Sequence, residues 1–191
     1  MNETKIQFSK RETEMMCNAD IILTKNRILE KVRLMLEVLQ EQLRSFQFHA
    51  DLAPVFNIPP KISRGENYEG LPYLILDYPR FFKPEDIFAI RTMFWWGNFF
   101  STTLHLSGSH KSLYGPVIEA NSSLLAQNNF YVGINANPWA HHFEQSNYQV
   151  IKTGKEILAG ERQTSHLKLA TKIPLDEWPS ALDILVRNWK L

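Results

Sequence analysis

The stretch from residue 88 to residue 107 constrains the fold more than any other part of the sequence. Two apolar segments, FAIRTMFWW and FFSTTLHLS, flank a Gly97-Asn98 pair. A glycine at the first central position of a two-residue loop is typical of a type II′ β-hairpin. Strands that are joined by so short a loop cannot be parallel. The sequence therefore predicts a tight central hairpin and, around it, a mainly antiparallel sheet.

The predicted turn also determines which side chains share a face of the hairpin. If Trp96 lies opposite Phe99, then Arg91 and His105 lie on opposite faces, and a pocket on the sheet would use only one of them. Both faces carry large aromatic rings, which stabilise a fold only when they are removed from water. We therefore expect both faces to be covered, and a folding core is favoured over a ligand platform.

Helical patterns lie at both ends of the chain. Ser9 and Glu12 match a capping box, which predicts a short first helix. In the segment 25–46, KNRILEKVRLMLEVLQEQLRSF, apolar residues recur every three or four positions and predict a long second helix. The segment 175–191 predicts a closing helix with Pro179 in its first turn.

The middle of the chain alternates between strand and helix patterns. In chain order, the predicted elements are a proline-rich connector in which the prolines forbid a helix (54–73), a buried strand (71–79), a helix with Pro116 near its first turn (115–129), a strand (130–135), a loop (136–148), a short helix (153–162) and a half-buried strand (166–173). The whole order favours an α+β fold, with N-terminal helices packed on the sheet and a closing C-terminal helix. Residues 1–191 are expected to form a single globular domain.

Composition narrows the classes of function and the compartment. Lys and Arg number 21 against 20 Asp and Glu, so the formal net charge of +1 gives no field that would attract duplex nucleic acid. The single cysteine, Cys17, excludes an intrachain disulfide and a cysteine-based metal cage, as suits a reducing cytoplasm. No secretory signal is recognisable, and no apolar run approaches the ~20 residues that span a bilayer. We expect a cytoplasmic protein with no membrane span and no cofactor.

Histidine is the first residue type to consider for chemistry. His141, His142 and Glu144 form the only local cluster of nitrogen and carboxylate ligands in the sequence. Adjacent side chains in an extended loop point in opposite directions, so both histidines could bind one metal only if the loop bends. A surface or packing role is therefore favoured, and no metal site is predicted.

Arg91 is predicted to lie in the middle of a strand among apolar residues, where its charge needs a partner. One interpretation pairs it with Asp77 or Glu119. The other makes it an anion anchor in an aromatic pocket. The sequence leaves both interpretations open.

His105 shares its predicted face with Ser101 and Thr103. It could bind a polar ligand, or it could act as a base for Ser101. Residues 101 and 105 lie about 13 Å apart along a strand, which is too far for direct proton transfer. A partly buried histidine with satisfied hydrogen bonds is therefore favoured over a catalytic base.

Motifs of the common enzyme classes are absent from the sequence, including Walker A, GxSxG and the dinucleotide fingerprint. Loops often carry function, and the candidate ligand-binding residues come from loops and from the hairpin: Arg64, Arg91, His105, Trp139 and His142. We interpret the chain as a non-catalytic binding domain for a small molecule or a protein partner. Self-association is expected if the aromatic residues are exposed. The alternative is a small hydrolase using His105 or the His141, His142 and Glu144 loop, with or without a metal, so the sequence leaves open whether the protein is an enzyme.

One resemblance in outline covers the chain up to the hairpin. FSK at 8–10, the long helix that follows, the Arg64-Gly65 pair and a strand that opens with Leu71-Pro72 are together similar to the YktB-like family of uncharacterised bacterial α+β proteins. That family has a richer arginine cluster before its first strand, where this chain has only Lys61 and Arg64. The resemblance implies an α+β fold and a bacterial protein, and it implies no activity.

Overall fold

The structure is a computed structural model that describes residues 6–47 and 52–191, without the side chains of 161–163. The chain begins with α1 (Lys10–Met16) and α2 (Ala19–Arg44). Ser9 and Glu12 form the predicted capping box at α1. The helix α2 begins at Ala19, whereas the sequence predicts a start at residue 25. The Asn18 side chain accepts a hydrogen bond from the Asp20 amide and so caps the N-terminus of the helix.

Seven strands form one antiparallel sheet, and their spatial order is β1-β2-β3-β4-β7-β5-β6. Their bounds are β1 (Lys61–Tyr68), β2 (Leu71–Lys83), β3 (Asp86–Trp95), β4 (Phe99–Ser107), β5 (Tyr131–Gly133), β6 (Tyr148–Val150) and β7 (His166–Pro174). The last strand in the sequence, β7, therefore lies inside the sheet, between β4 and β5. The predicted α+β class with an antiparallel sheet is confirmed.

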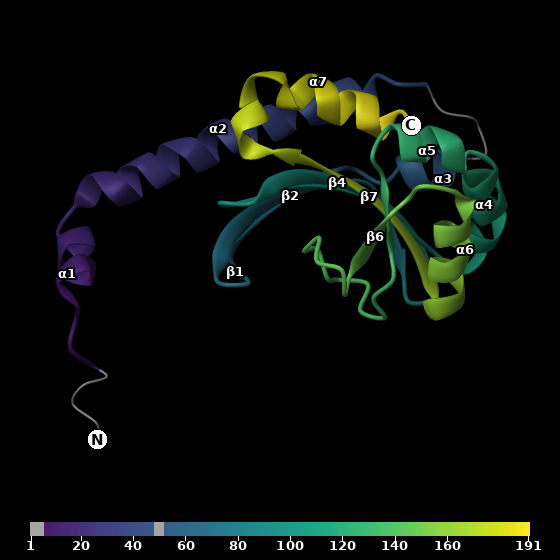
Figure 1. The fold of residues 1–191 in the computed structure, drawn as a ribbon. Coiled ribbons are helices and arrows are strands. Elements are labelled where there is room, and N and C mark those ends of the chain that lie inside the picture. The colour runs from purple at the N-terminus through teal and green to yellow at the C-terminus, as the bar shows by residue number, and fades with distance from the viewer. Residues whose placement is uncertain (1–5, 48–51) are drawn as a thin grey trace.

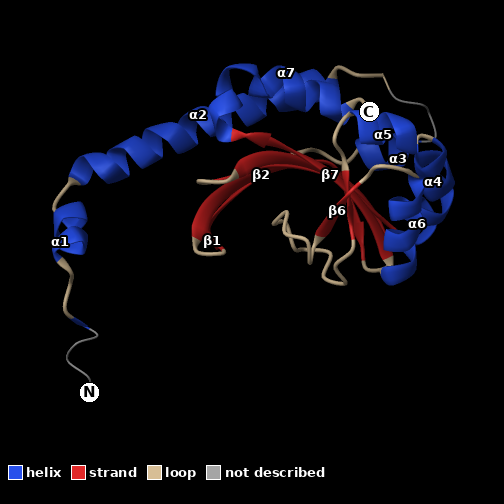
Figure 2. Cartoon of the chain, in the orientation of Figure 1, coloured by secondary structure: helices blue, strands red, loops and turns tan. Residues whose placement is uncertain are grey.

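The sheet is strongly curved; the helices that follow α1 lie on its convex side, whereas α1 and the N-terminal part of α2 extend away from the sheet (Figure 1). The remaining helical elements are α3 (Ala53–Phe56), α4 (Gly108–Ala120), α5 (Ser122–Gln127), α6 (Gly154–Gln163), the short 3-10 helix η3 (Leu175–Glu177) and the closing helix α7 (Trp178–Trp189). Figure 2 shows α2 and α7 over one part of the sheet and α3 to α6 over the other. The loop 134–147, between β5 and β6, lies on the concave side (Figures 1 and 2).

Two hydrophobic cores follow from this arrangement of helices. In the first core, Leu36 and Leu39 of α2 and Leu185 of α7 pack against the sheet around Phe100. The second core packs α3, α5 and α6 against the other part of the sheet, and Leu106 of β4 is among its fully buried residues. Burial of these side chains supplies the main driving force for folding. Both cores are on the convex face, so the concave face depends on loop 134–147 for its cover.

Two helices, α3 and α4, contain prolines at positions where the sequence predicts no helix or a different helix start. Pro54 lies in the first turn of α3, where a helix tolerates proline because the missing amide would be unpaired anyway. The expectation that the 54–73 connector contains no helix is therefore wrong, and β1 also forms within it. Pro116 lies inside α4, which begins at Gly108 and not beside the proline as predicted.

The hairpin has a loop one residue longer than predicted. Trp95 pairs with Phe99, so Trp96, Gly97 and Asn98 form the loop. The Asn98 amide donates to the Trp95 carbonyl, 3.0 Å away, and Gly97 has φ +71° at the third position of this turn, as a type II turn requires. The predicted type II′ loop is wrong. One added residue in the loop shifts the pairing by one position, which moves each side chain of one strand to the opposite face relative to the other strand.

That change of register alters the predicted faces. Arg91 pairs across the strands with Thr103, and Ala89 pairs with His105. Arg91 and His105 therefore lie on the same face of the hairpin, the concave one, and the prediction that a pocket would use only one of them is wrong. The rings of Phe94, Trp95, Phe99 and Phe100 are buried as expected, with Trp95 and Phe99 on this same face, whereas Trp96 in the turn is half-buried.

The strand β7 is more deeply buried than its alternating pattern predicts. His166 and Lys168, assigned to the solvent side, are 3% and 2% exposed, and only Lys172 and Pro174 of β7 are exposed. The cause is loop 134–147, which covers this side of the strand. A charged side chain is thereby enclosed at the centre of the molecule.

Candidate functional site

Cross-strand register gathers polar side chains at the centre of the concave face. Asp77 of β2 lies opposite Arg91 of β3, and Arg91 lies opposite Thr103 of β4. Two residues further along β4, and on the same face as Thr103, His105 lies opposite Lys168 of β7. Side chains at opposite and diagonal positions of neighbouring strands are within contact distance. The register alone therefore places two cations, a histidine and one carboxylate beside each other.

Loop 134–147 closes over this group and is held at several points. The Ile134 amide donates to the Asn147 carbonyl at 2.9 Å, which joins the two ends of the loop. The Tyr68 hydroxyl accepts hydrogen bonds from the amides of His141 and His142, at 2.6 and 3.2 Å. These bonds fix where the loop places its side chains above the sheet.

A small cavity of ≈ 10 Å³ remains between loop and sheet. This is close to the minimum space for one water molecule. The side chains that line it and matter for chemistry are Arg91, Thr103, His105, Trp139, His141 and Lys168. We call this set the concave pocket.

Arg91 forms a bidentate ion pair with Asp77, in which Nε and Nη2 donate to the two carboxylate oxygens at 2.8 and 2.9 Å. Its Nη1 lies 3.1 Å from Nε2 of His141. An arginine can only donate, so His141 Nε2 accepts and the ring carries its proton on Nδ1. Burial and the nearby cations Lys168 and Arg91 hold the pKa of His141 well below its usual value, in agreement with a neutral ring.

Lys168 is the buried cation of the concave pocket that lacks a carboxylate partner. Its Nζ donates to the Ala140 carbonyl at 2.7 Å and lies 5.2 Å from the centre of the Tyr148 ring. None of the ion pairs found among the described residues includes it. Burial, together with repulsion from Arg91, lowers the pKa of Lys168 from 10.5 to about 7.

Two further histidines adjoin the amine of Lys168. The ring centres of His105 and His166 are 5.4 Å apart, and Nε2 of each ring is buried without a hydrogen-bond partner. Burial is the main cause that lowers the pKa of His105 to about 3 and that of His166 to about 4. Both rings are therefore neutral near pH 7. They add no positive charge to the site and do not form an ion pair with a carboxylate.

The structure brings together three of the five residues chosen from the sequence. Arg91, His105 and Trp139 line the concave pocket. Arg64 does not line it and instead pairs with Glu66 on an exposed part of β1, Nη2 to Oε1 at 2.6 Å. His142 does not line it either, because adjacent residues of the loop point in different directions and His141 takes the inward position.

Lys168 and His141 are the residues of the concave pocket that the sequence analysis missed. From the sequence, His141 is a candidate metal ligand, a surface or packing residue or a part of the hydrolase alternative, and it is not among the predicted ligand-binding residues. The sequence contains one signal that this face is covered. Ala170 lies between Lys168 and Lys172 on the face expected to be exposed, and its small side chain permits close approach of another segment. Ala170 is in fact fully buried.

No metal or membrane feature is found in the part of the chain that the structure describes. Within residues 6–47 and 52–191, no three His, Cys, Asp or Glu side chains are grouped so that they could hold a metal ion. His142 Nδ1 and Glu144 Oε2 are 3.8 Å apart. In the same residues, no helix combines the length and the apolar character that crossing a bilayer demands.

The fold and the pocket together define an α+β protein with a buried polar site under a loop, in which Arg91 is paired with Asp77 and Lys168 has no carboxylate partner. Comparison with known proteins finds no family model, no curated protein and no solved structure that matches the chain. The resemblance to the YktB-like family stays a prediction. The function must therefore be argued from the concave pocket itself.

Proposed function

We propose that this protein is a non-catalytic binding protein that holds the anionic group of a small molecule, a carboxylate or another oxyanion, in the concave pocket. The observation that carries the proposal is Lys168, a cation 2% exposed that is not paired with a carboxylate, because Asp77 pairs with Arg91. Buried charges in proteins are normally paired. A bound anion would supply the missing partner.

The charge of the pocket favours an anion over a cation or a neutral molecule. The one carboxylate, Asp77, already accepts hydrogen bonds from Nε and Nη2 of Arg91. The rings of His105 and His141, which line the pocket, can each donate one hydrogen bond while neutral. Protonated Lys168 therefore leaves the site with an excess positive charge in a medium of low dielectric constant, where attraction to an anion is strong.

Access to the pocket is controlled by Trp139. This side chain is 48% exposed, and it lines both the concave pocket and an open groove on its outer side with Phe82 and Arg91. The cavity of ≈ 10 Å³ cannot hold a ligand larger than a water molecule. Entry of an organic anion therefore requires the Trp139 ring and its part of loop 134–147 to move outward.

The amine of Lys168 couples this movement to binding. Its hydrogen bond to the Ala140 carbonyl, next to Trp139, helps to hold the loop closed. A carboxylate oxygen that reaches the amine takes over this bond, and bonds between two charged groups are stronger than bonds to a neutral carbonyl. The anion and the Ala140 carbonyl are thus alternative acceptors for the same donor, so binding of the anion releases this hold on the loop.

The test is a titration with sodium acetate and with sodium sulfate at constant ionic strength, followed by thermal unfolding. We expect at least one of the two anions to raise the melting temperature in a saturable way. The affinity should fall about fiftyfold between pH 7 and pH 9, because the amine, with a pKa of about 7, must be protonated to bind. Absence of saturable stabilisation by both anions would refute the proposal.

The variant Lys168→Met removes the charge and keeps an unbranched side chain that is one atom shorter. The matched control is Lys172→Met, which changes an exposed lysine on the same strand and the same face. We expect the effect of the anion to disappear in the first variant and to persist in the second. An equal response of both variants would show that the anions act on the surface charge of the protein.

The alternative, a hydrolase, stays a prediction. His105 lies near Thr103 and Trp139, but Nε2 of its ring has no hydrogen-bond partner, and Ser101 is four residues away on the same strand. The pKa of about 3 makes this ring a weak base. The buried charge of Lys168 and the enclosure of the pocket by loop 134–147 support binding over catalysis.

We also propose a cytoplasmic location, for which the single cysteine is the support. A protein partner and self-association stay predictions. The reason given for self-association was exposure of the hairpin rings, whereas Phe94, Trp95, Phe99 and Phe100 are buried. A small molecule is therefore the partner that we favour.

A further inference from the structure

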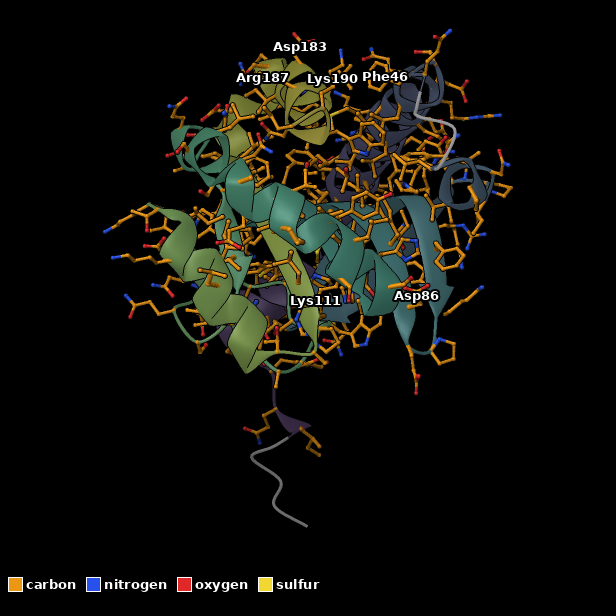
Figure 3. All side chains as sticks on the ribbon, turned by 90° about the vertical axis from the view of Figure 1, so that its right-hand side faces the viewer. Phe46, Asp86, Lys111, Asp183, Arg187 and Lys190 are labelled. Atoms are coloured by element: carbon orange, nitrogen blue, oxygen red, sulfur yellow. The ribbon has the colours of Figure 1, made fainter. Side chains whose placement is uncertain are left out.

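A second and larger cavity lies on the opposite, convex side of the sheet, between the two cores. Its volume is ≈ 290 Å³. The floor is formed by β3, β4 and β7, and the walls by α4, α5 and the C-terminal end of α7. Figure 3 views this side of the molecule, with α4 and α5 toward the viewer and the labelled Lys190 marking the end of α7.

The lining of this convex cavity is mainly apolar and carries no charged side chain; its polar residues are Thr102, Asn121 and Asn188. Among its residues are Ile90, Leu104, Leu125 and Leu169. An apolar cavity of about half this volume holds a benzene molecule. The convex cavity therefore has room for a lipophilic molecule of roughly ten non-hydrogen atoms.

One polar group in the floor has no partner. Thr102 of β4 lines the cavity and is 4% exposed, and its hydroxyl oxygen makes no hydrogen bond. A buried hydroxyl without a partner is costly. A threonine hydroxyl can donate one hydrogen bond and can accept others, so it suits a ligand with a single hydroxyl or carbonyl group.

The cavity has an apolar rim that is open to solvent. Val117 of α4, Leu124 of α5 and Leu191 line it and are 57%, 41% and 42% exposed. Exposed apolar side chains beside an apolar cavity are typical of an entry route for a ligand. A ligand could therefore enter without disturbing either core.

We propose that the convex cavity binds a small uncharged lipophilic molecule that carries one hydroxyl or carbonyl group, with Thr102 as its hydrogen-bond partner. A carboxylate is disfavoured because no cationic side chain lines the cavity, and a buried charge needs a partner. This site shares no lining residue with the concave pocket and does not depend on the function proposed there.

The proposal is tested by calorimetric titration of the full chain with 1-octanol and with sodium octanoate, two probes with the same chain length and different charge. We expect saturable binding of 1-octanol and at least tenfold weaker binding of octanoate at pH 8. Equal binding of the two probes would overturn the neutral specificity. Absence of 1-octanol binding would overturn the site.

Four variants locate the binding. Val117→Trp and Leu124→Trp narrow the rim on two different helices and should each weaken 1-octanol binding at least tenfold, whereas Leu113→Trp, also exposed on α4 but outside the lining, should leave it unchanged. Thr102→Val keeps the shape and removes one neutral hydrogen bond, so we expect a loss of about fivefold. Circular dichroism checks that each variant is folded. Unchanged affinity in both rim variants would place the probe elsewhere, and unchanged affinity in Thr102→Val would remove the role of the hydroxyl.

Discussion

Replacement of Lys168 by methionine should make the protein more stable at neutral pH, although it removes a buried hydrogen bond. In the folded protein the pKa of Lys168 is about 7, against 10.5 for an ordinary lysine. Between these two pH values the unfolded chain binds a proton that the folded chain does not. The free energy of unfolding therefore falls as the pH is lowered from 10.5 to 7, and this contribution stays constant at lower pH.

The size of the effect follows from the two pKa values. The destabilisation by Lys168 is about 4 kcal/mol at pH 7 and about 2 kcal/mol at pH 9. Methionine cannot replace the hydrogen bond to the Ala140 carbonyl, and leaving that buried group unpaired costs about 1–3 kcal/mol at either pH. The net gain in stability of Lys168→Met at pH 7 is therefore a few kcal/mol at most.

The comparison between two pH values isolates the effect of the charge, because the lost hydrogen bond does not depend on pH. Urea unfolding of the wild type and of Lys168→Met at pH 7 and pH 9 should show that the advantage of the variant shrinks by about 2 kcal/mol at the higher pH. Lys172→Met should follow the wild type at both values, since Lys172 is exposed. If the stability curves of the wild type and Lys168→Met were parallel between pH 7 and pH 9, the burial of an uncompensated amine would be refuted.

The histidines, the buried ion pair and one helical glycine give three further predictions. Because the pKa values of His105 and His166 are lowered to about 3 and about 4, stability should fall below pH 6.5 by about 1.4 kcal/mol per pH unit for each ring, and His105→Gln should reduce this slope in urea unfolding at pH 4 to 7. Arg91→Met leaves the carboxylate of Asp77 buried and unpaired and should cost about 3–5 kcal/mol, part of which Asp77→Asn in the same chain should restore. Gly160→Ala would place its Cβ 2.9 Å from a methyl carbon of β5, so its melting temperature should fall, although alanine in place of glycine normally stabilises a helix by about 1 kcal/mol.

Elements with a strong local signal could be predicted from the sequence. The apolar repeat of α2, the proline and terminal charges of α7, and the two runs of β-forming residues in β3 and β4 all correspond to observed elements. Each of these signals depends on residues close together in the chain. The α+β class followed from their order and from the antiparallel hairpin, so the class was also within reach of the sequence.

The concave pocket was only partly predictable, because its geometry depends on single-residue steps. Gly97 can serve a two-residue or a three-residue loop, and the choice decides whether Arg91 and His105 share a face. His141 and His142 differ in the same way, since one residue along the loop separates an inward from an outward side chain. Residue types alone do not determine such steps.

Lys168 shows a second physical limit. It and Lys172 occupy equivalent positions in the alternating pattern of β7, yet one is enclosed and the other exposed. What separates them is the segment around Ala140, which has no periodic pattern and lies 28 residues earlier in the sequence than Lys168. The same covering segment buries the charge, lowers its pKa and provides the Trp139 side chain that encloses the pocket. The chemical character of Lys168 is therefore a property of how the loop folds back on the sheet, and local sequence cannot distinguish it from an ordinary surface lysine.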